Sequence, residues 1–430
     1  MTTFVLDAND ADLRIAAGGT VVARAPGFAA LGSGELLLGR DAVHQFRLRP
    51  REASNLFWHR LDTEPLTVPH AQAANHADLV FRQLERLGRE AGVGADDELI
   101  VAAPATMTTA QLSLLLGIAE GVGLRVTGIV DAAVVASATQ DLPARFQHVD
   151  ISLHRVVVTR IDGGDQVRRT GVQDVTECSI STLLDAWINL IADRFVRETR
   201  FDPLSIADTE QQLYDQTYAW LTADTRTALL NVTVERQGVQ RRIEVATASL
   251  VEKTHQRYAL LDRALDGTPV VLSHRAAALP GLRSYLSARV PGIEALPTDA
   301  VFAGAARHLD AIRSGPDNVR LVTRLPSAGV RRDASRPSAQ PTHLLFDATA
   351  VQIGAGVRID RALFPDLPPG YTDGAAAIAI DGAGARLSLA PGVAAAVDGR
   401  PAPDGVALTV GATVEVGGVK LRLIRVMDRA

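Results

Sequence analysis

The chain contains 430 residues, which is more than one domain usually holds and therefore predicts at least two domains. Apolar residues make up 47% of it and charged residues 22%, which excludes a wholly disordered, collagen-like or disulfide-scaffold chain. The formal net charge of -5 is small and aromatic residues make up only 4%, so the composition indicates neither a nucleic-acid binder nor a membrane binder.

Three features predict a cytoplasmic protein. The only cysteine, Cys178, cannot form an internal disulfide, which fits a reducing compartment. Residues 1–7 contain neither the basic nor the long apolar segment of a signal peptide. The most apolar stretch, 112–138, is interrupted by Glu120, Arg125 and Asp131, so it predicts a buried helix, a turn and a strand rather than a membrane span.

Strands and helices alternate along residues 1–314, which predicts an α/β architecture. In chain order we expect strands at 3–7, 21–24 and 35–39, a helix at 76–91, a strand at 98–103, a helix at 108–121, a strand at 125–130 and a helix at 131–139. Strands at 146–150 and 156–161 follow, then helices at 181–199 and 210–231, a hairpin at 232–246 that turns at Gln237-Gly238, and a helix at 250–265. A strand at 270–273 and helices at 279–289 and 301–313 complete this part.

The composition changes beyond this α/β part. Residues 327–341 are rich in Ser, Pro, Gly and Arg and almost lack bulky apolar residues, which is typical of a flexible tether. Their arginines leave a site for an acidic partner as the alternative interpretation. From residue 343, short β-runs alternate with turn pairs such as Asp373-Gly374 and Asp398-Gly399, which predicts a small all-β sandwich. We therefore expect domains at 1–315 and 342–430, joined by a linker at 316–341.

The common catalytic motifs are missing from the sequence. It contains no Gly-x-x-x-x-Gly-Lys-Ser/Thr loop, no Gly-x-Gly-x-x-Gly, no Gly-x-Ser-x-Gly and no His-Glu-x-x-His. His70 and His76, with Asp78 nearby, match no common metal spacing and are interpreted as surface or capping residues. Cys178 has no neighbouring His or Lys, which favours a small buried residue over a nucleophile. We therefore predict no catalytic residue and no metal site.

The first predicted domain contains an ordered series of short motifs. They are Asp7-Ala8-Asn9-Asp10, Leu38-Gly39-Arg40-Asp41-Ala42, the stretches 100–105, 129–136, 149–154 and 269–275, and Ala300-Val301-x-x-Gly304-Ala305-Ala306. In this order they resemble the nucleotide-binding domain of the seventy-kilodalton heat-shock chaperones, the DnaK-like family of the actin/hexokinase superfamily. The resemblance implies an actin-like two-lobed ATPase fold, with duplicated mixed sheets and flanking helices, and ATP with Mg²⁺ as the family's ligand.

The segments that would contact the nucleotide depart from the family pattern. Ala8 stands where a glycine is expected, and the stretch 151–154 replaces a glycine run. The stretch 57–60, where the family has a lysine near the γ-phosphate, contains none, and no lysine precedes Lys253. Glycine lets backbone N–H groups approach a phosphate, so these changes predict a nucleotide site that no longer holds phosphates. If a nucleotide binds, the resemblance assigns its contacts to Asp7, Asn9, Asp10, Asp150, Ser273 and Arg275.

The two aspartates of this set have more than one interpretation. Asp7 and Asp150 would organise a metal ion, as the resemblance implies, or they cap turns at the ends of strands. A lone cation held by the Asp7/Asn9/Asp10/Asp12 group is a third interpretation.

The C-terminal β-domain resembles a degenerate forkhead-associated (FHA) domain. The resemblance rests on Val351-Gln352-Ile353-Gly354, on Val397-Asp398-Gly399-Arg400 and on the closing Val414-Glu415-Val416-Gly417-Gly418. The residues that hold phosphothreonine in that family are not found, and Arg358 and Arg361 are the only nearby cations. A generic β-sandwich interaction module is the alternative.

Three functions follow from these patterns. The first is a non-catalytic, pseudo-ATPase scaffold or adaptor protein of bacterial, DnaK-like type that acts through protein–protein interactions, without a cofactor and with self-association as an open possibility. The second is a divergent ATP-dependent chaperone or ATPase, in which Asp7 and Asp150 organise Mg²⁺. The third is a sugar or small-molecule kinase of the same superfamily, for which no carbohydrate-site signature is visible.

Overall fold

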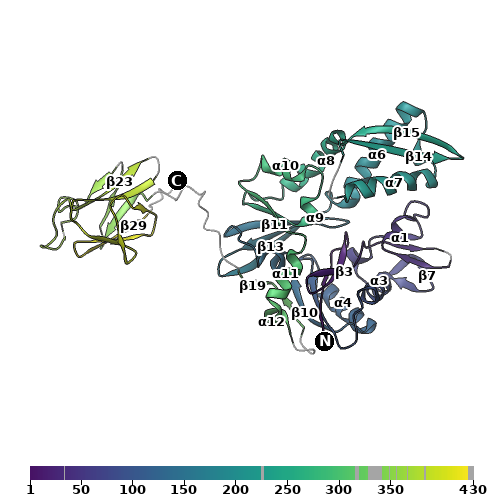
Figure 1. Ribbon diagram of the computed structural model, residues 1–430, viewed down its shortest axis with the longest axis horizontal. Coiled ribbons are helices and arrows are strands. Elements are labelled where there is room, and N and C mark those ends of the chain that lie inside the picture. Colours follow the sequence, from purple (N-terminus) through teal and green to yellow (C-terminus); the bar gives the residue numbers. More distant parts are fainter. Residues whose placement is uncertain are drawn as a thin grey trace. The chain divides into compact units, whose positions relative to one another are not determined.

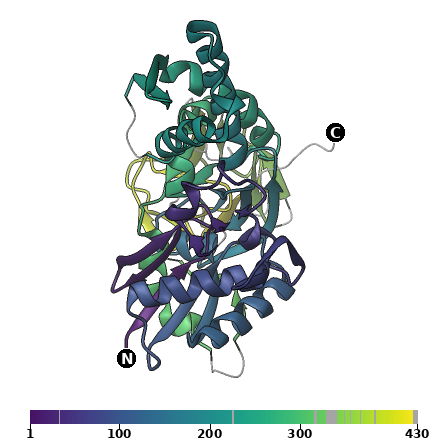
Figure 2. The ribbon, with the colours of Figure 1, turned by 90° about the vertical axis from the view of Figure 1, so that its right-hand side faces the viewer.

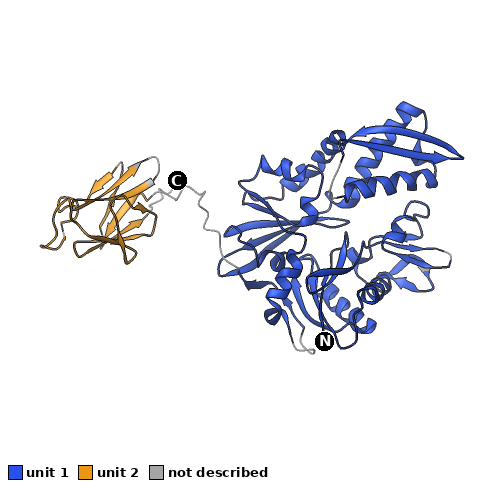
Figure 3. Ribbon diagram, in the orientation of Figure 1, with its two compact units in different colours: residues 1–331 blue, residues 332–430 orange. Residues whose placement is uncertain are grey.

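The computed structural model describes residues 1–32, 34–223, 227–314, 319–327, 341–347, 349–354, 356–365, 367–381 and 384–424 (Figure 1). The chain divides into two compact units, Met1–Arg331 and Arg332–Ala430 (Figure 3). The domain predicted at 1–315 lies within the first unit and the domain predicted at 342–430 within the second. Most of the predicted linker, 316–341, lies outside the described residues.

Two mixed six-stranded sheets form the framework of the first unit. The first has the order β18-β10-β9-β1-β2-β3, with bounds Leu321–Val322, Val126–Asp131, Glu98–Ala103, Thr3–Asp7, Leu13–Ala17 and Thr20–Ala25. The second has the order β17-β16-β11-β12-β13-β19, with bounds Ile293–Ala295, Val270–Leu272, Arg145–Ile151, Val156–Asp162, Gln166–Val175 and Arg324–Pro326. In each sheet, parallel strands on one side meet an antiparallel meander on the other.

Helices cover these sheets and separate them. Helices α3 (His76–Ala91) and α4 (Thr109–Val122) lie side by side and pack their apolar residues into one core with the first sheet (Figure 2). Helices α5 (Ala132–Ser137) and α11 (Ala300–Arg307) pack against each other, in a core that takes residues from both sheets. A Cβ atom on Gly304 would lie 1.9 Å from the Val135 carbonyl oxygen, so this close packing requires glycine.

A third group of elements caps the second sheet. It comprises helices α6 (Ile180–Thr199), α7 (Ala207–Leu221) and α8 (Thr247–Asp262), the short helix η1 (Pro203–Ser205), and the hairpin β14 (Leu229–Arg236) and β15 (Val239–Ala246). The hairpin turns at Gln237 and Gly238 with φ of 51° and 75°, as the sequence predicts. The helix predicted at 210–231 is too long, because α7 ends at Leu221 and residues from Leu229 belong to β14.

Shorter elements complete the first unit. They are α1 (Arg40–Val43), α2 (Phe57–Arg60), α9 (His274–Ala277), α10 (Leu282–Ser287), α12 (Leu309–Ile312), β4 (Ala29–Leu31), β5 (Leu36–Leu38), β6 (Ala53–Ser54), β7 (Pro65–His70) and β8 (Ala73–Asn75). Strands β18 and β19 lie inside the range expected as a linker. They pair with β10 and β13, which buries Leu325 against the core between the sheets.

The described part of the second unit contains only strands and their connections. One antiparallel sheet has the order β21-β20-β29-β28-β25-β26, with bounds Thr349–Gln352, His343–Phe346, Val419–Ile424, Thr413–Val416, Ala395–Val397 and Arg400–Ala402. The other has the order β22-β23-β24-β27, with bounds Gly356–Arg358, Ala376–Asp381, Gly384–Leu389 and Ala407–Leu408. Leu344, Ile378 and Leu421 belong to one apolar core that takes residues from both sheets.

Across the described ranges of both units, no helix has the length and apolar character needed to cross a membrane.

Candidate functional site

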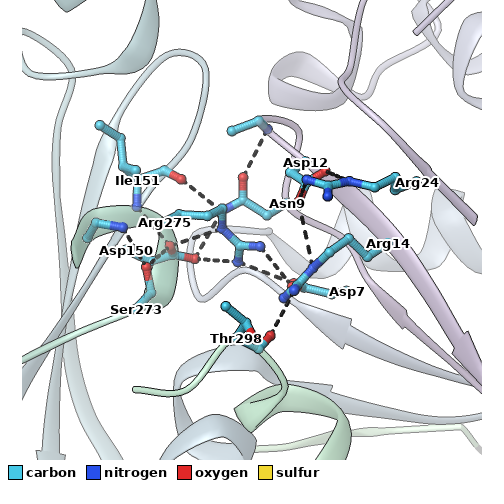
Figure 4. Close-up of polar contacts among 12 residues, drawn as sticks. Asp7, Asn9, Asp12, Arg14, Arg24, Asp150, Ile151, Ser273, Arg275 and Thr298 are labelled. Carbon is cyan, nitrogen blue, oxygen red and sulfur yellow. Dashed lines mark hydrogen bonds and ion pairs between the residues drawn. The ribbon is translucent and has the colours of Figure 1, made fainter. Parts of the chain in front are cut away.

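The candidate site lies where the two sheets of the first unit face each other (Figure 4). Asp7 is the last residue of β1, and Asp150 is close to the end of β11. Arg275 lies in α9, which follows β16, the parallel neighbour of β11. The topology therefore brings one aspartate from each sheet to the same place, with an arginine between them.

The Arg275 guanidinium bridges the two carboxylates. Its Nη1 lies 2.8 Å from Asp7 Oδ2, and its Nη2 lies 3.0 Å from Asp150 Oδ2. Longer hydrogen bonds of 3.4 Å to Asp7 and 3.3 Å to Asp150 complete the contact. The side chains of Arg275, Asp7 and Asp150 are only 9%, 1% and 15% exposed, respectively, so each charge is removed from water and is stabilised by its partners.

A second arginine completes the charge balance around Asp7. Arg14 donates from Nη2 to Asp7 Oδ2 at 2.8 Å and from Nη1 to the Thr298 carbonyl at 2.8 Å. Its guanidinium also stacks over the Phe302 ring, 4.8 Å from the centroid. Because Arg14 lies on β2 of the first sheet and Thr298 follows the second, this contact also joins the two sheets.

The remaining sequence-predicted residues belong to the same network. Asn9 donates to Asp150 Oδ2 at 2.9 Å and to the Ile151 carbonyl at 3.0 Å, and the Ser273 hydroxyl donates to Asp150 Oδ1. Asp10 accepts a hydrogen bond from the Leu153 N–H at 2.8 Å. Five of the six residues that the resemblance assigns to the nucleotide therefore form one hydrogen-bonded network, and the sixth, Asp10, bonds to the Leu153 N–H beside it.

The two arginines keep both aspartates ionised. Burial alone raises the pKa of Asp7, but Arg275 and Arg14 together hold it below its usual value. Burial also raises the pKa of Asp150, and Arg275 more than compensates, so this carboxyl too has a lowered pKa. Among the described residues Asp10 forms no ion pair, and burial raises its pKa. The aspartate pair thus stays charged at neutral pH through a cation of the chain itself.

The residues present do not fit a metal-bridged polyphosphate. A Mg²⁺ ion needs free oxygen lone pairs, whereas the carboxylate oxygens of Asp7 and Asp150 already accept hydrogen bonds from arginine, serine and asparagine. The N–H groups of Ile151, Ser152 and Leu153 donate to Asp150, to the Arg155 carbonyl and to Asp10. These amides are therefore not available for phosphate oxygens. Within the described chain, no group of three His, Cys, Asp or Glu residues is placed to hold a metal.

The stretch where the family resemblance expects a lysine forms helix α2. His59 of this helix faces Arg155, with 2.8 Å between His59 Nδ1 and Arg155 Nη2. Burial and the adjacent Arg155 lower the pKa of His59 to about 4. This position therefore holds a neutral imidazole at pH 7, with the positive charge on Arg155 beside it.

The other singled-out residues have local partners. His76 Nδ1 lies 2.7 Å from Asp62 Oδ1, and His70 accepts a hydrogen bond from the Gln72 N–H. Cys178 is fully buried, and burial raises the pKa of its thiol to about 12. Its sulfur is therefore a protonated thiol in the core, which does not suit a nucleophile.

Of the cavities that adjoin the network in the described structure, two hold the most space. The larger, about 440 Å³, is lined by polar residues from both halves of the unit, among them Arg24, Arg40, Tyr218, His274 and Arg275. The smaller, about 50 Å³, contains His148, Asp150 and Asp10. His148 is 3% exposed, and neither of its ring nitrogens has a hydrogen-bond partner in the described structure.

Comparison of the chain with models of protein families gives no match, and a search among curated proteins gives none either.

Sequence reasoning missed Arg14, Thr298 and His148. A signal existed for Arg14, because it is the one charged residue in the otherwise apolar strand β2 and therefore needs a buried partner. Thr298 acts through its backbone carbonyl, which no residue type reveals. Arg275 was among the expected residues, but as a contact for a ligand rather than for Asp7 and Asp150.

The first prediction concerns the Arg275 bridge. Arg275→Met leaves Asp7 and Asp150 buried without their shared cation, so we expect it to lower the free energy of unfolding by about 3–5 kcal/mol. Urea denaturation of the full chain measures this. Arg24→Met is the matched control: Arg24 pairs with Asp12 at 2.9 Å but is 57% exposed, and its loss should cost at most about 1 kcal/mol.

A double variant separates charge from packing. Within the described chain, Asp150 forms an ion pair only with Arg275. Asp150→Asn combined with Arg275→Met therefore removes both charges, and it should be more stable than Arg275→Met alone. Equal stability of the single and double variants would contradict the account.

The second prediction concerns His148 and pH. Burial lowers the pKa of His148 to about 4, whereas an unfolded histidine titrates near about 6.5. Between these values the unfolded state binds more protons, so the stability contribution is lost as the pH falls from about 6.5 to 4. His148→Leu should remove about 1.4 kcal/mol per pH unit from this slope. Urea denaturation of the wild type and of His148→Leu at a series of pH values tests this. Identical slopes of unfolding free energy against pH for the wild type and the variant would contradict it.

Proposed function

We propose that the protein is a non-catalytic scaffold or adaptor of DnaK-like type, which acts through protein–protein interactions in the bacterial cytoplasm. The observation that carries the proposal is the position of Arg275, which bridges Asp7 and Asp150 at 2.8 and 3.0 Å. In the resembled family, that place belongs to the metal ion and the phosphates. A guanidinium there neutralises both carboxylates without a ligand.

The arrangement of the sheets supports the interpretation of the first unit as an actin-like fold. Each of the two six-stranded mixed sheets has parallel strands on one side and an antiparallel meander on the other, and α5 and α11 pack in a core that takes residues from both sheets. This agrees with the two lobes that the sequence resemblance implies. The two antiparallel sheets of the second unit agree with an FHA-like β-sandwich, which we propose as the interaction module.

The contacts across the cleft support a fixed scaffold rather than a nucleotide-driven machine. Four contacts join the first sheet and the residues beside it to the second sheet and the residues beside it. They are Arg275 to Asp7, Asn9 to Asp150, Asp10 to the Leu153 N–H, and Arg14 to the Thr298 carbonyl. These bonds hold the cleft closed without ATP. We therefore propose that the chain presents one closed conformation to its partners.

One observation favours a second candidate, a divergent ATP-dependent protein. The cavity of about 440 Å³ lies beside Arg275, and it is lined by Arg40, which is exposed and has no ion pair within the described residues. A nucleotide would enter this cavity only with its phosphates held by arginines instead of a metal ion. This candidate thus predicts nucleotide binding that does not require Mg²⁺.

Titration calorimetry and thermal unfolding with ATP–Mg²⁺ test the proposed function. We expect no binding heat and no increase in the free energy of unfolding at about millimolar nucleotide, because the Arg275 guanidinium occupies the position of the metal ion. A ligand present at about 100 times its Kd would add about 2.7 kcal/mol to the free energy of unfolding. Any phosphate release should be equal in the wild type and in Asp150→Asn. Tight ATP–Mg²⁺ binding with hydrolysis lost in Asp150→Asn would contradict the scaffold, and binding of equal strength in a chelator would favour the second candidate.

A further inference from the structure

The hairpin of β14 and β15 has two different edges. The outer edge of β14 is closed by two glutamines of α7. Gln212 accepts from the Glu235 N–H at 2.8 Å and donates to the Glu235 carbonyl at 3.0 Å, and Gln216 makes the same pair of bonds with Thr233 at 3.1 and 2.8 Å. The side-chain amides therefore replace a neighbouring strand along this edge. In Figure 1, β14 lies between α7 and β15.

The outer edge of β15 has no such cover. Because Arg236 and Val239 flank a two-residue turn, the backbone N–H and C=O groups of Gln240, Arg242 and Glu244 point away from β14. None of these backbone groups makes a hydrogen bond within the described part of the chain. The three side chains are exposed, whereas Ile243 and Val245 between and beside them are buried in the core.

We propose that this edge pairs with the same edge of a second copy of the chain. An open strand edge is a template for another strand, and an antiparallel pair of identical strands has a two-fold axis. With the axis at Ile243, Arg242 of each copy lies opposite Glu244 of the other. Two opposite-charge cross-strand pairs then form between residues whose backbone groups point toward the partner.

The neighbouring registers are unfavourable. An axis at Arg242 would place arginine opposite arginine, and an axis at Glu244 would place glutamate opposite glutamate. A shift by one residue would set the outward backbone groups against inward ones. The charge pattern therefore selects one register, and it selects a second copy as the occupant, because the complement of Arg242 lies two residues away on the same strand.

The resulting interface closes on itself. It forms a four-stranded sheet, β14-β15 of one copy continued by β15-β14 of the other, and the glutamines of α7 close both outer edges. Gln212 and Gln216 occupy the outward backbone groups of Thr233 and Glu235 on both outer edges, which leaves too short an open edge for a third copy, so the assembly is a dimer rather than a fibre. The proposal uses no residue of the Arg275 network and stands apart from the proposed function.

Analytical ultracentrifugation of the full chain tests the dimer. We expect the wild type to dimerise at about 100 µM or below, and Arg242→Glu or Glu244→Arg to raise the dimer Kd by about tenfold or more, because each turns both attractive pairs into repulsive ones. The double variant R242E/E244R restores opposite charges and should return to the wild-type Kd. Arg236→Glu makes the same charge change away from the β15 edge and should leave the Kd unchanged.

Three results would overturn the proposal. They are a wild type that stays monomeric at about 100 µM, a dimer whose Kd the single charge changes do not alter, and a double variant that fails to recover. Residues 242 and 244 are exposed, so circular dichroism should show all variants folded. The nucleotide titrations of the proposed function involve other residues, so a failure of either proposal is distinguishable from a failure of the other.

Discussion

The structure of the candidate site depends on one interaction, the bridge from the Arg275 guanidinium to the buried carboxylates of Asp7 and Asp150. Two carboxylates that face each other in a water-poor place repel, and each loses its hydration. A cation between them offsets both costs. Here the cation is a side chain with five N–H donors, which fixes geometry as well as charge, since each carboxylate accepts bonds from a different side of the planar group.

The same bridge links the two halves of the first unit. Asp7 belongs to the first sheet, whereas Asp150 belongs to the second sheet and Arg275 to helix α9, which follows a strand of that sheet. Asn9, Asp10 and Arg14 make further hydrogen bonds between the two halves. The backbone N–H groups of Ile151, Ser152 and Leu153 donate to acceptors of the chain itself. Charge balance, the joining of the two halves and the hydrogen bonds of these amides are therefore all supplied by contacts within the chain.

Much of the framework was predictable because buried strands and amphipathic helices carry periodic apolar residues. The strand at 98–103 and the helix at 76–91 are confirmed as β9 and α3. The predicted helix at 210–231 was wrong at its end, because local sequence did not reveal that the first strand of the predicted hairpin begins at Leu229 and bonds to the glutamines of α7. The six site residues were found together, but their roles depend on contacts between positions as distant as Asp7 and Arg275, and no local pattern contains that information. Strands β18 and β19 were missed for the same reason, since each is stabilised by pairing with a remote strand.

A crystal structure of the full chain grown with millimolar ATP and Mg²⁺ tests the central claim most directly. The account predicts that the Arg275 guanidinium contacts both Asp7 and Asp150 and that no density for a metal-bound triphosphate lies between them. Ordered density for ATP and its metal ion at the ends of β1 and β11, with the Arg275 side chain displaced, would contradict it.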